Sequence, residues 1–247
     1  MAEGVIATGL TAGVAAAGLT AAFGTAGPET AARWQPRRLA AVAAELPDGV
    51  TPPGTSGRIL HAALALFSEC GFHGTSVRQI ATAVGINPAT LYGHYPSKEH
   101  VLADLVLIGH QELHARLTAA LAAAGPAPAD RLAALVREHA LIHCDYPLLA
   151  LVANAELHAL SAPRAQAALD LRSRCSDMLV RVLAGGADTG DFALADPVLT
   201  AIAIGGLGMH IAHWFAPGEP YDRDQVADAY VQFALRMTGA VISTREG

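Results

Sequence analysis

The sequence predicts an all-α protein, and three observations lead to this fold class. The composition is 52% hydrophobic but only 5% aromatic, and its apolar residues are mainly alanine and leucine, which favour helices over strands. From residue 56 onward, apolar residues recur at three- and four-residue steps, as on one face of a helix. Glycine and proline fall between these stretches, where helices end. With 247 residues and 15% charged side chains, the chain can bury a substantial core, which excludes general disorder.

Residues 1–53 are predicted to form a flexible, low-complexity extension. Gly4 to Gly27 carries no charge and consists mostly of alanine, glycine and threonine. A membrane-spanning anchor is the alternative for such a stretch, but alanine and glycine gain little free energy on transfer into lipid. Glu3 stands where a secretory signal would carry lysine or arginine. The turn-rich residues 47–54 mark the end of the extension.

The next segment, residues 54–103, begins with a long amphipathic helix. The helix starts near Ser56 and is closed by Gly71. Its apolar residues are spaced by three and four positions and are Ile59, Ala63, Leu66, Phe67 and Cys70.

Two short helices follow, and the signals at their ends are local. Ser76 and Gln79 have the spacing of a capping box, and Gly85 ends this helix after about two turns. Asn87 then serves as the N-cap of another helix, with Pro88 at its first position. Two short helices that are joined by a glycine turn and packed on a longer one form a helix-turn-helix.

This segment is also the part of the chain that is not net negative. The formal net charge of the chain is −6, but residues 54–103 carry three basic and two acidic groups together with four histidines. Residues 1–53 carry three basic and four acidic groups, and residues 104–247 carry ten and sixteen. A polyanion such as DNA would therefore meet residues 54–103.

The amino-acid sequence of this segment resembles that of a known family. The stretch "TSVRQIATAVGINPATLYGHYPSKEHVL" (75–102) is similar to the DNA-binding domain of the tetracycline-repressor (TetR) family, and "GRILHAALALFSECGFHG" (57–74) is similar to its first helix. The resemblance covers about fifty contiguous residues. It implies a DNA-binding transcriptional regulator with an N-terminal helix-turn-helix domain over residues 54–103.

The resemblance also implies roles for individual residues. Thr75 and Arg78 would contact DNA phosphates from the second helix, while Tyr92, His94 and Lys98 would clamp the backbone on the other side of the groove. Base reading would fall to the exposed start and flank of the recognition helix, namely Asn87, Ala89, Thr90 and Gly93.

Residues 104–247 are helical throughout by their apolar spacing. The expected helices, separated by glycine and proline, are 97–123, 128–145, 147–160, 163–185, 195–215 and 223–243. The family resemblance implies that this region binds an effector and forms a homodimer. The run 206–237 resembles a subgroup of which some members respond to acyl-CoA thioesters.

Two methionines and several polar residues within these apolar helices are candidate ligand contacts. The candidates are His143, Asn154, His158, Met178, Met209, His210, His213 and Trp214. They would suit a largely apolar molecule with one or two hydrogen-bonding groups, such as an acyl-CoA thioester.

Several kinds of site are not expected. Two pairs of helical histidines, His139 with His143 and His210 with His213, have no third ligand at a fixed spacing, so no metal site is predicted. No cofactor motif or nucleophile motif occurs, and an enzyme is not expected. Three cysteines are odd in number and widely spaced, which is typical of reduced, buried thiols in a cytoplasmic protein.

The sequence therefore predicts a cytoplasmic, homodimeric repressor that binds a palindromic double-stranded DNA operator and is released by a small apolar effector. Two alternatives remain open. One is a constitutive DNA-binding protein whose helical domain has no ligand cavity. The other is a regulator that is tethered to a membrane by residues 4–27.

Overall fold

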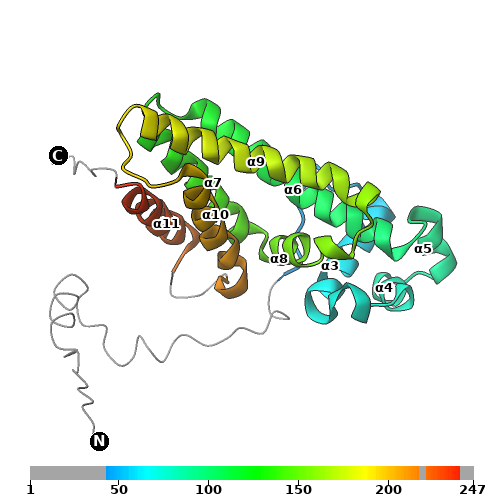
Figure 1. Cartoon of the computed structure of the whole chain (residues 1–247). Coiled ribbons are helices and arrows are strands. Elements are labelled where there is room, and N and C mark those ends of the chain that lie inside the picture. The colour runs from blue at the N-terminus through cyan, green and yellow to red at the C-terminus, as the bar shows by residue number, and fades with distance from the viewer. Residues whose placement is uncertain (1–42, 217–220, 240–247) are drawn as a thin grey trace, which may run out of the picture. The chain divides into compact units, whose positions relative to one another are not determined.

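The computed structural model describes residues 43–216 and 221–239, which belong to one compact unit. In these ranges the regular structure consists of nine α-helices, α3 to α11, and one short 3-10 helix, η2 (Figure 1). The all-α class is thus confirmed for the described part of the chain. The apolar stretch Gly4–Gly27 lies outside the described residues.

The second and third helices have the caps that the sequence predicts, whereas the first extends past Gly71, where it is kinked at a positive φ of 72°, to Gly74. These three helices are α3 (Gly54–Gly74), α4 (Val77–Val84) and α5 (Pro88–His94). The capping box is present, with Ser76 Oγ accepting from Gln79 N at 3.2 Å and Gln79 Oε1 accepting from Ser76 N at 2.8 Å. Gly85 adopts a positive φ of 76°, which only glycine reaches at low cost, and the chain can therefore turn from α4 to α5.

The remaining helices follow the expected order with three main differences, of which one is that the last helix, expected over 223–243, ends at Met237. Their bounds are α6 (Lys98–Ala123), α7 (Pro128–Asp145), α8 (Pro147–Ala155), η2 (Leu157–Ala159), α9 (Ala162–Asp188), α10 (Pro197–Trp214) and α11 (Arg223–Met237). The helix expected over 147–160 is divided, with η2 separated from α8 at Glu156. Helix α9 continues past the glycine pair at 185–186, because Gly186 makes room for the Phe192 ring rather than ending the helix.

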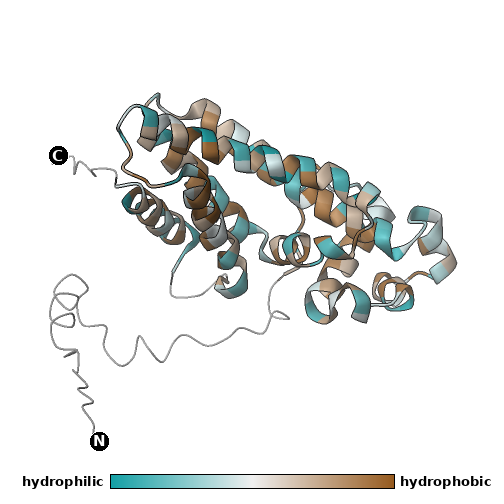
Figure 2. Ribbon diagram, viewed as in Figure 1, coloured by the Kyte–Doolittle hydropathy of each residue, from teal (hydrophilic) through white to brown (hydrophobic). Residues whose placement is uncertain are grey.

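The hydrophobic core under the helix-turn-helix is continuous with the rest of the protein. Buried residues of α3 to α6 pack together with Leu148 and Val152 of α8 and Ala165 of α9. Helix α6 also runs without a break through residue 103, and α9 lies beside it (Figures 1 and 2). The DNA-binding part and the helical part are thus joined by a shared core and by α6.

The end of the N-terminal extension is packed against this core. Leu46 is 6% exposed and belongs to the same hydrophobic cluster. The Nδ1 atom of His61 forms a hydrogen bond of 2.8 Å with the carbonyl oxygen of Ala44. Residues from Ala44 onward therefore contact the core, several positions before the boundary that was expected after residue 53.

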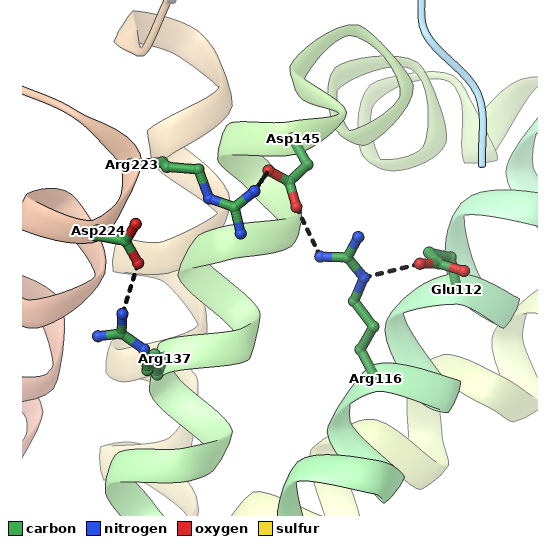
Figure 3. Close-up of polar contacts among 6 residues, drawn as sticks. All are labelled: Glu112, Arg116, Arg137, Asp145, Arg223 and Asp224. Atoms are coloured by element: carbon green, nitrogen blue, oxygen red, sulfur yellow. Dashed lines mark hydrogen bonds and ion pairs between the residues drawn. The ribbon is translucent and has the colours of Figure 1, made fainter. Parts of the chain in front are cut away.

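A cluster of ion pairs fastens α6, α7 and α11 together (Figure 3). Arg116 of α6 pairs with Glu112 and with Asp145 of α7, both at 2.7 Å. Arg223 of α11 pairs with the second oxygen of Asp145 at 2.5 Å. Because Asp145 is largely buried and accepts from two guanidinium groups, it joins the ends of three helices.

The exposure of one cysteine and of one helix differs from what apolar residues in a core would show. Cys144 and Cys175 are buried as expected, but Cys70 is exposed because the end of α3 turns that face outward. Helix α10 is apolar and long enough to cross a membrane by length and composition alone, yet only 28% of it is buried within the described structure. This helix therefore presents an apolar surface that the described residues do not cover.

Candidate DNA interface and ligand cavity

Helix α5 has the exposure expected of a recognition helix. Leu91 is its one fully buried residue and anchors it to the core. The residues around this anchor that were predicted to meet DNA are exposed: Arg78, Asn87, Ala89, Thr90, Tyr92, Gly93 and His94. Tyr92, with 53% of its surface exposed, is available for contact and does not belong to the core.

The N-cap of α5 determines which polar groups remain for reading bases. Asn87 Oδ1 accepts from Thr90 N at 2.7 Å and from Thr90 Oγ1 at 3.1 Å. The carboxamide oxygen of Asn87 is therefore engaged, while Asn87 and Thr90 both remain exposed. Ala89 and Gly93 add no polar group, so among the four residues predicted to read bases only Asn87 and Thr90 carry polar side chains.

Thr75 and Lys98, for which phosphate contacts are predicted, are both engaged in hydrogen bonds within the protein. Thr75 is 2% exposed, and its hydroxyl donates to the carbonyl oxygens of Gly71 at 2.9 Å and Leu66 at 3.2 Å. Lys98 Nζ donates to the carbonyl oxygens of Phe72 at 2.5 Å and Thr75 at 2.6 Å. Burial lowers the pKa of Lys98, while the charge of Glu156 opposes this shift. Both side chains are thus used in fastening the end of α3 to the start of α6.

His94 is held in place by a contact with α3. Its Nδ1 atom lies 3.0 Å from the Ser56 hydroxyl oxygen, and the ring remains exposed. Arg58, also from α3, donates to the carbonyl oxygen of Val84 at the end of α4. These two contacts fix α4 and α5 on α3, which orients the exposed face of α5.

A cavity of about 320 Å³ lies among α6, α7, α8, α9 and α10. Most of its wall is apolar, including Leu113 and Leu117 of α6 and Leu149 of α8. Three of its lining residues, Ser176 of α9 and Val198 and Ile202 of α10, are also exposed, so the cavity opens to the surface between these helices. A partly open, apolar cavity of this size is typical of a small-molecule site.

The cavity includes three of the eight residues predicted to bind a ligand: His143, Asn154 and Met209. The other five do not line its wall. Met178 is packed in the core between helices, and Trp214 packs beside the buried residues of α10 and α11. His158 is exposed on η2, and His210 and His213 stack on each other at the surface with ring centroids 5.2 Å apart. Helix α10 turns these two histidines away from the cavity.

Three histidines line the cavity in their neutral form. Burial lowers the pKa of His143 to about 4, and it lowers the pKa of His139 and His110 as well. Nδ1 of His143 faces the carbonyl oxygen of His139 at 2.7 Å, and Nδ1 of His110 faces that of Val106 at 2.8 Å. Because a carbonyl can only accept, both Nδ1 atoms carry the proton, and both Nε2 atoms are acceptors.

Several polar groups of the wall are absent from the set predicted from sequence. They are His110, His139, Tyr146, Arg172 and Ser176. Two of them could have been predicted from sequence. His139 lies four residues before His143, and His110 lies on the same helix face as Leu113 and Leu117. In the part of the chain that the structure describes, no group of three or more His, Cys, Asp or Glu side chains could hold a metal ion.

A surface-exposed helix-turn-helix joined to a helical domain with a cavity defines a DNA-binding regulator. Residues 59–105 match the family model "Bacterial regulatory proteins, tetR family", and residues 125–238 match "Tetracyclin repressor-like, C-terminal domain". A TetR-family regulatory protein from Rhodococcus RHA1, known from a crystal structure, is 33% identical in sequence to this chain. The two structures superpose with a TM-score of 0.71, over 77% of this chain and all of the other. The chain belongs to the TetR family of transcriptional regulators.

Two further proteins are similar over most of their length. The transcriptional repressor KstR2 of Rhodococcus jostii (strain RHA1) is 26% identical over 196 residues, which cover 75% of this chain and 96% of the repressor. AibR, solved in complex with isovaleryl coenzyme A and operator DNA, shares the fold with a TM-score of 0.64 at 22% identity, over 74% of this chain and 97% of AibR. The protein is therefore a TetR-type transcription regulator and not an enzyme.

Proposed function

We propose that this protein is a repressor that binds a palindromic operator as a homodimer and is released by a largely apolar effector held in the cavity. The observation that carries the proposal is the course of α6. Its first residue, Lys98, is bonded to the helix-turn-helix, and its residues 109–117 form one wall of the cavity. Lys98 and Leu113 are separated by about 22 Å at the helical rise of 1.5 Å per residue.

Helix α8 provides a second connection between the two sites. Glu156, at its end, accepts a hydrogen bond from the backbone N–H of Phe72 at 3.2 Å. Ala150, Ala153 and Asn154 of the same helix line the cavity. An effector that pushed α6 and α8 apart would therefore move the helix-turn-helix at two points. Such an effector shifts the protein only by its differential affinity for the two arrangements.

The wall of the cavity supports an apolar effector, and an acyl-CoA thioester is the specific candidate. The cavity wall is mostly aliphatic, and its neutral histidines offer hydrogen-bond acceptors. AibR, which shares the fold, binds an acyl thioester. At about 320 Å³ the cavity is at the lower end of the range for ligand sites, so it suits the acyl part, with the nucleotide outside. The presence of a cavity counts against a constitutive DNA-binding protein with a filled helical domain.

The uncovered apolar surface supports a homodimer. Among the described residues, large apolar side chains that are exposed on α10 and α11 and do not line the cavity are Leu199, Leu207, Phe233 and Met237. A second copy of the chain would bury this surface by a two-fold arrangement. Two recognition helices would then enter major-groove faces that are one DNA turn apart, roughly 34–36 Å.

In this arrangement the contacts to DNA come from exposed residues of α4 and α5. Arg78, Tyr92 and His94 would meet phosphates, which fix the position of the protein without reading sequence. Asn87, Ala89, Thr90 and Gly93 would face the base edges. Since their side chains are small, specificity depends on thymine methyl contacts and on DNA shape.

The test is release from the operator. Operator fragments are first selected from genomic DNA by the purified protein, and gel shifts are then titrated with long-chain and steroid-like acyl-CoA thioesters and with sugars and amino acids. We expect release by an acyl thioester alone. Leu113→Trp, which fills the cavity, should keep operator binding but lose release, whereas His210→Ala, outside the cavity, should behave as the native protein. Release by a sugar or amino acid, or insensitivity to every thioester, would contradict the proposal.

A further inference from the structure

One side chain in the cavity wall carries a formal charge, and it is Arg172 of α9. The residues that line the cavity include no aspartate or glutamate. Arg172 is half-buried and lies one helical turn from Ser176, which is at the opening between α9 and α10. Its guanidinium group is thus placed between the apolar interior and the surface.

The neighbours of Arg172 leave its charge uncompensated within the described ranges, 43–216 and 221–239. Nη1 lies 3.5 Å from Asn154 Oδ1, and Nη2 lies 3.9 Å from the sulfur of Met209. Both are neutral acceptors at long distances. By contrast, arginines such as Arg116 and Arg223 are paired with carboxylates at 2.5–2.7 Å. A partly buried guanidinium without a carboxylate retains unused donors that favour an anion.

The rest of the polar wall directs an anion to this one residue. Burial keeps His110, His139 and His143 neutral by lowering the pKa of each, and the charge of Arg172 contributes to this shift at His110. The Nε2 atoms of His110 and His143 are acceptors and would repel an anionic oxygen. Asn154 is oriented by its own hydrogen bond from Nδ2 to the carbonyl oxygen of Ala150 at 2.8 Å, so that its Oδ1 faces Arg172.

We propose that Arg172 binds an anionic group, a carboxylate or a phosphate, of an effector whose apolar body occupies the cavity. The charged end lies near the opening beside Ser176, and the apolar body extends between α6, α7 and α8. This inference rests on the proposed function for the position of the effector, and it adds the chemical class: an anionic amphiphile rather than a neutral one.

The experiment compares probes that differ only at one end. Binding of decanoate, decanol and decanoyl-CoA to the full-length protein is measured by calorimetry without DNA at neutral pH. We expect decanoate or decanoyl-CoA to bind about tenfold or more tightly than decanol, since a hydrogen bond to a charged group contributes that much affinity. Tighter binding of decanoate identifies a carboxylate, and tighter binding of decanoyl-CoA identifies a phosphate.

Variants then assign the effect to Arg172. Arg172→Gln should reduce the affinity for the anionic probe to that for decanol and leave decanol binding unchanged, while Arg172→Lys should retain part of the preference. Arg174→Gln is the matched control, because Arg174 is exposed on the same helix and does not line the cavity. Thermal unfolding of each variant shows whether it is folded.

Three results would overturn the inference. They are equal affinity of the native protein for decanol and the anions, no binding of any probe, and an equal loss of decanol and anion binding in Arg172→Gln. The calorimetry is done without operator DNA, so it tests this inference separately from the proposed function. An anion that binds through Arg172 but does not release the protein from its operator would contradict the proposed function and leave this inference intact.

Discussion

The Nζ atom of Lys98 donates a hydrogen bond of 2.6 Å to the backbone carbonyl oxygen of Thr75, which joins the first turn of α6 to the start of the helix-turn-helix. The same ammonium lies 4.2 Å from the centre of the Phe72 ring and donates to the Phe72 carbonyl at 2.5 Å. This lysine is the only one in the sequence. Its position makes it part of the connection between the cavity and the DNA interface.

Lys98→Met should therefore act mainly on stability. The change keeps an aliphatic stem but leaves two carbonyl groups without a charged donor, and we expect the free energy of unfolding to fall by about 1–3 kcal/mol. Operator affinity should fall alike for all sequences, while the slope of log K against log salt stays unchanged. Arg78→Gln should give the opposite pattern, with native stability and a salt slope reduced by about one unit. A loss of salt slope in Lys98→Met at native stability would show that the lysine meets a phosphate.

The buried histidines predict a loss of stability in mild acid. His143 has a pKa of about 4 in the folded protein against 6.5 for a free side chain, so the unfolded state binds more protons between these values. Stability is full above pH 6.5 and falls as the pH drops toward 4. Between pH 6.5 and 5, His143 by itself should account for a loss of about 1.6 kcal/mol in urea unfolding at constant protein concentration. His143→Gln should lose clearly less, and an identical pH dependence of the two proteins would refute the assignment.

Leu46 should be required for full stability although it precedes the first described helix. It is 6% exposed in the core cluster under α3, and Leu46→Ala should cost about 2–3 kcal/mol because it leaves a cavity there. Removal of residues 1–42, which keeps Leu46, should change the free energy of unfolding by less than about 0.5 kcal/mol. Chemical denaturation of the two proteins measures both effects. A larger loss for the truncation than for Leu46→Ala would contradict this boundary.

The exposed apolar residues of α10 should determine the oligomeric state. Leu199 is 65% exposed, and Leu199→Glu places a charge where the second copy would bury the leucine. We expect a folded monomer in sedimentation velocity and a weaker, non-cooperative operator complex. Leu169→Glu is the control, since Leu169 is 41% exposed and belongs to α9, not to α10 or α11. A native protein that is monomeric, or that associates with lipid vesicles through α10, would contradict the dimer.

The sequence by itself determined the helix-turn-helix, because the signals that build it are local. The Ser76–Gln79 capping box, the positive φ of Gly85 and the Asn87 cap of α5 each involve residues within four positions of one another. Such contacts follow from residue type and spacing alone. The order of the later helices and, within about two residues, their starts were determined in the same way, by proline at their first turns and by apolar periodicity, whereas several of their ends differ.

Only the tertiary structure decided what the polar residues of these helices do. Periodicity places a residue on the inner face of a helix, but it does not say whether the opposite helix touches that residue or leaves a space. His110, His143 and Arg172 meet at one cavity from three helices, whereas His210 and His213, equally suggestive in sequence, turn outward. Lys98 likewise satisfies carbonyl groups more than twenty residues away. These roles depend on distances between helices, which are set by packing over the whole core.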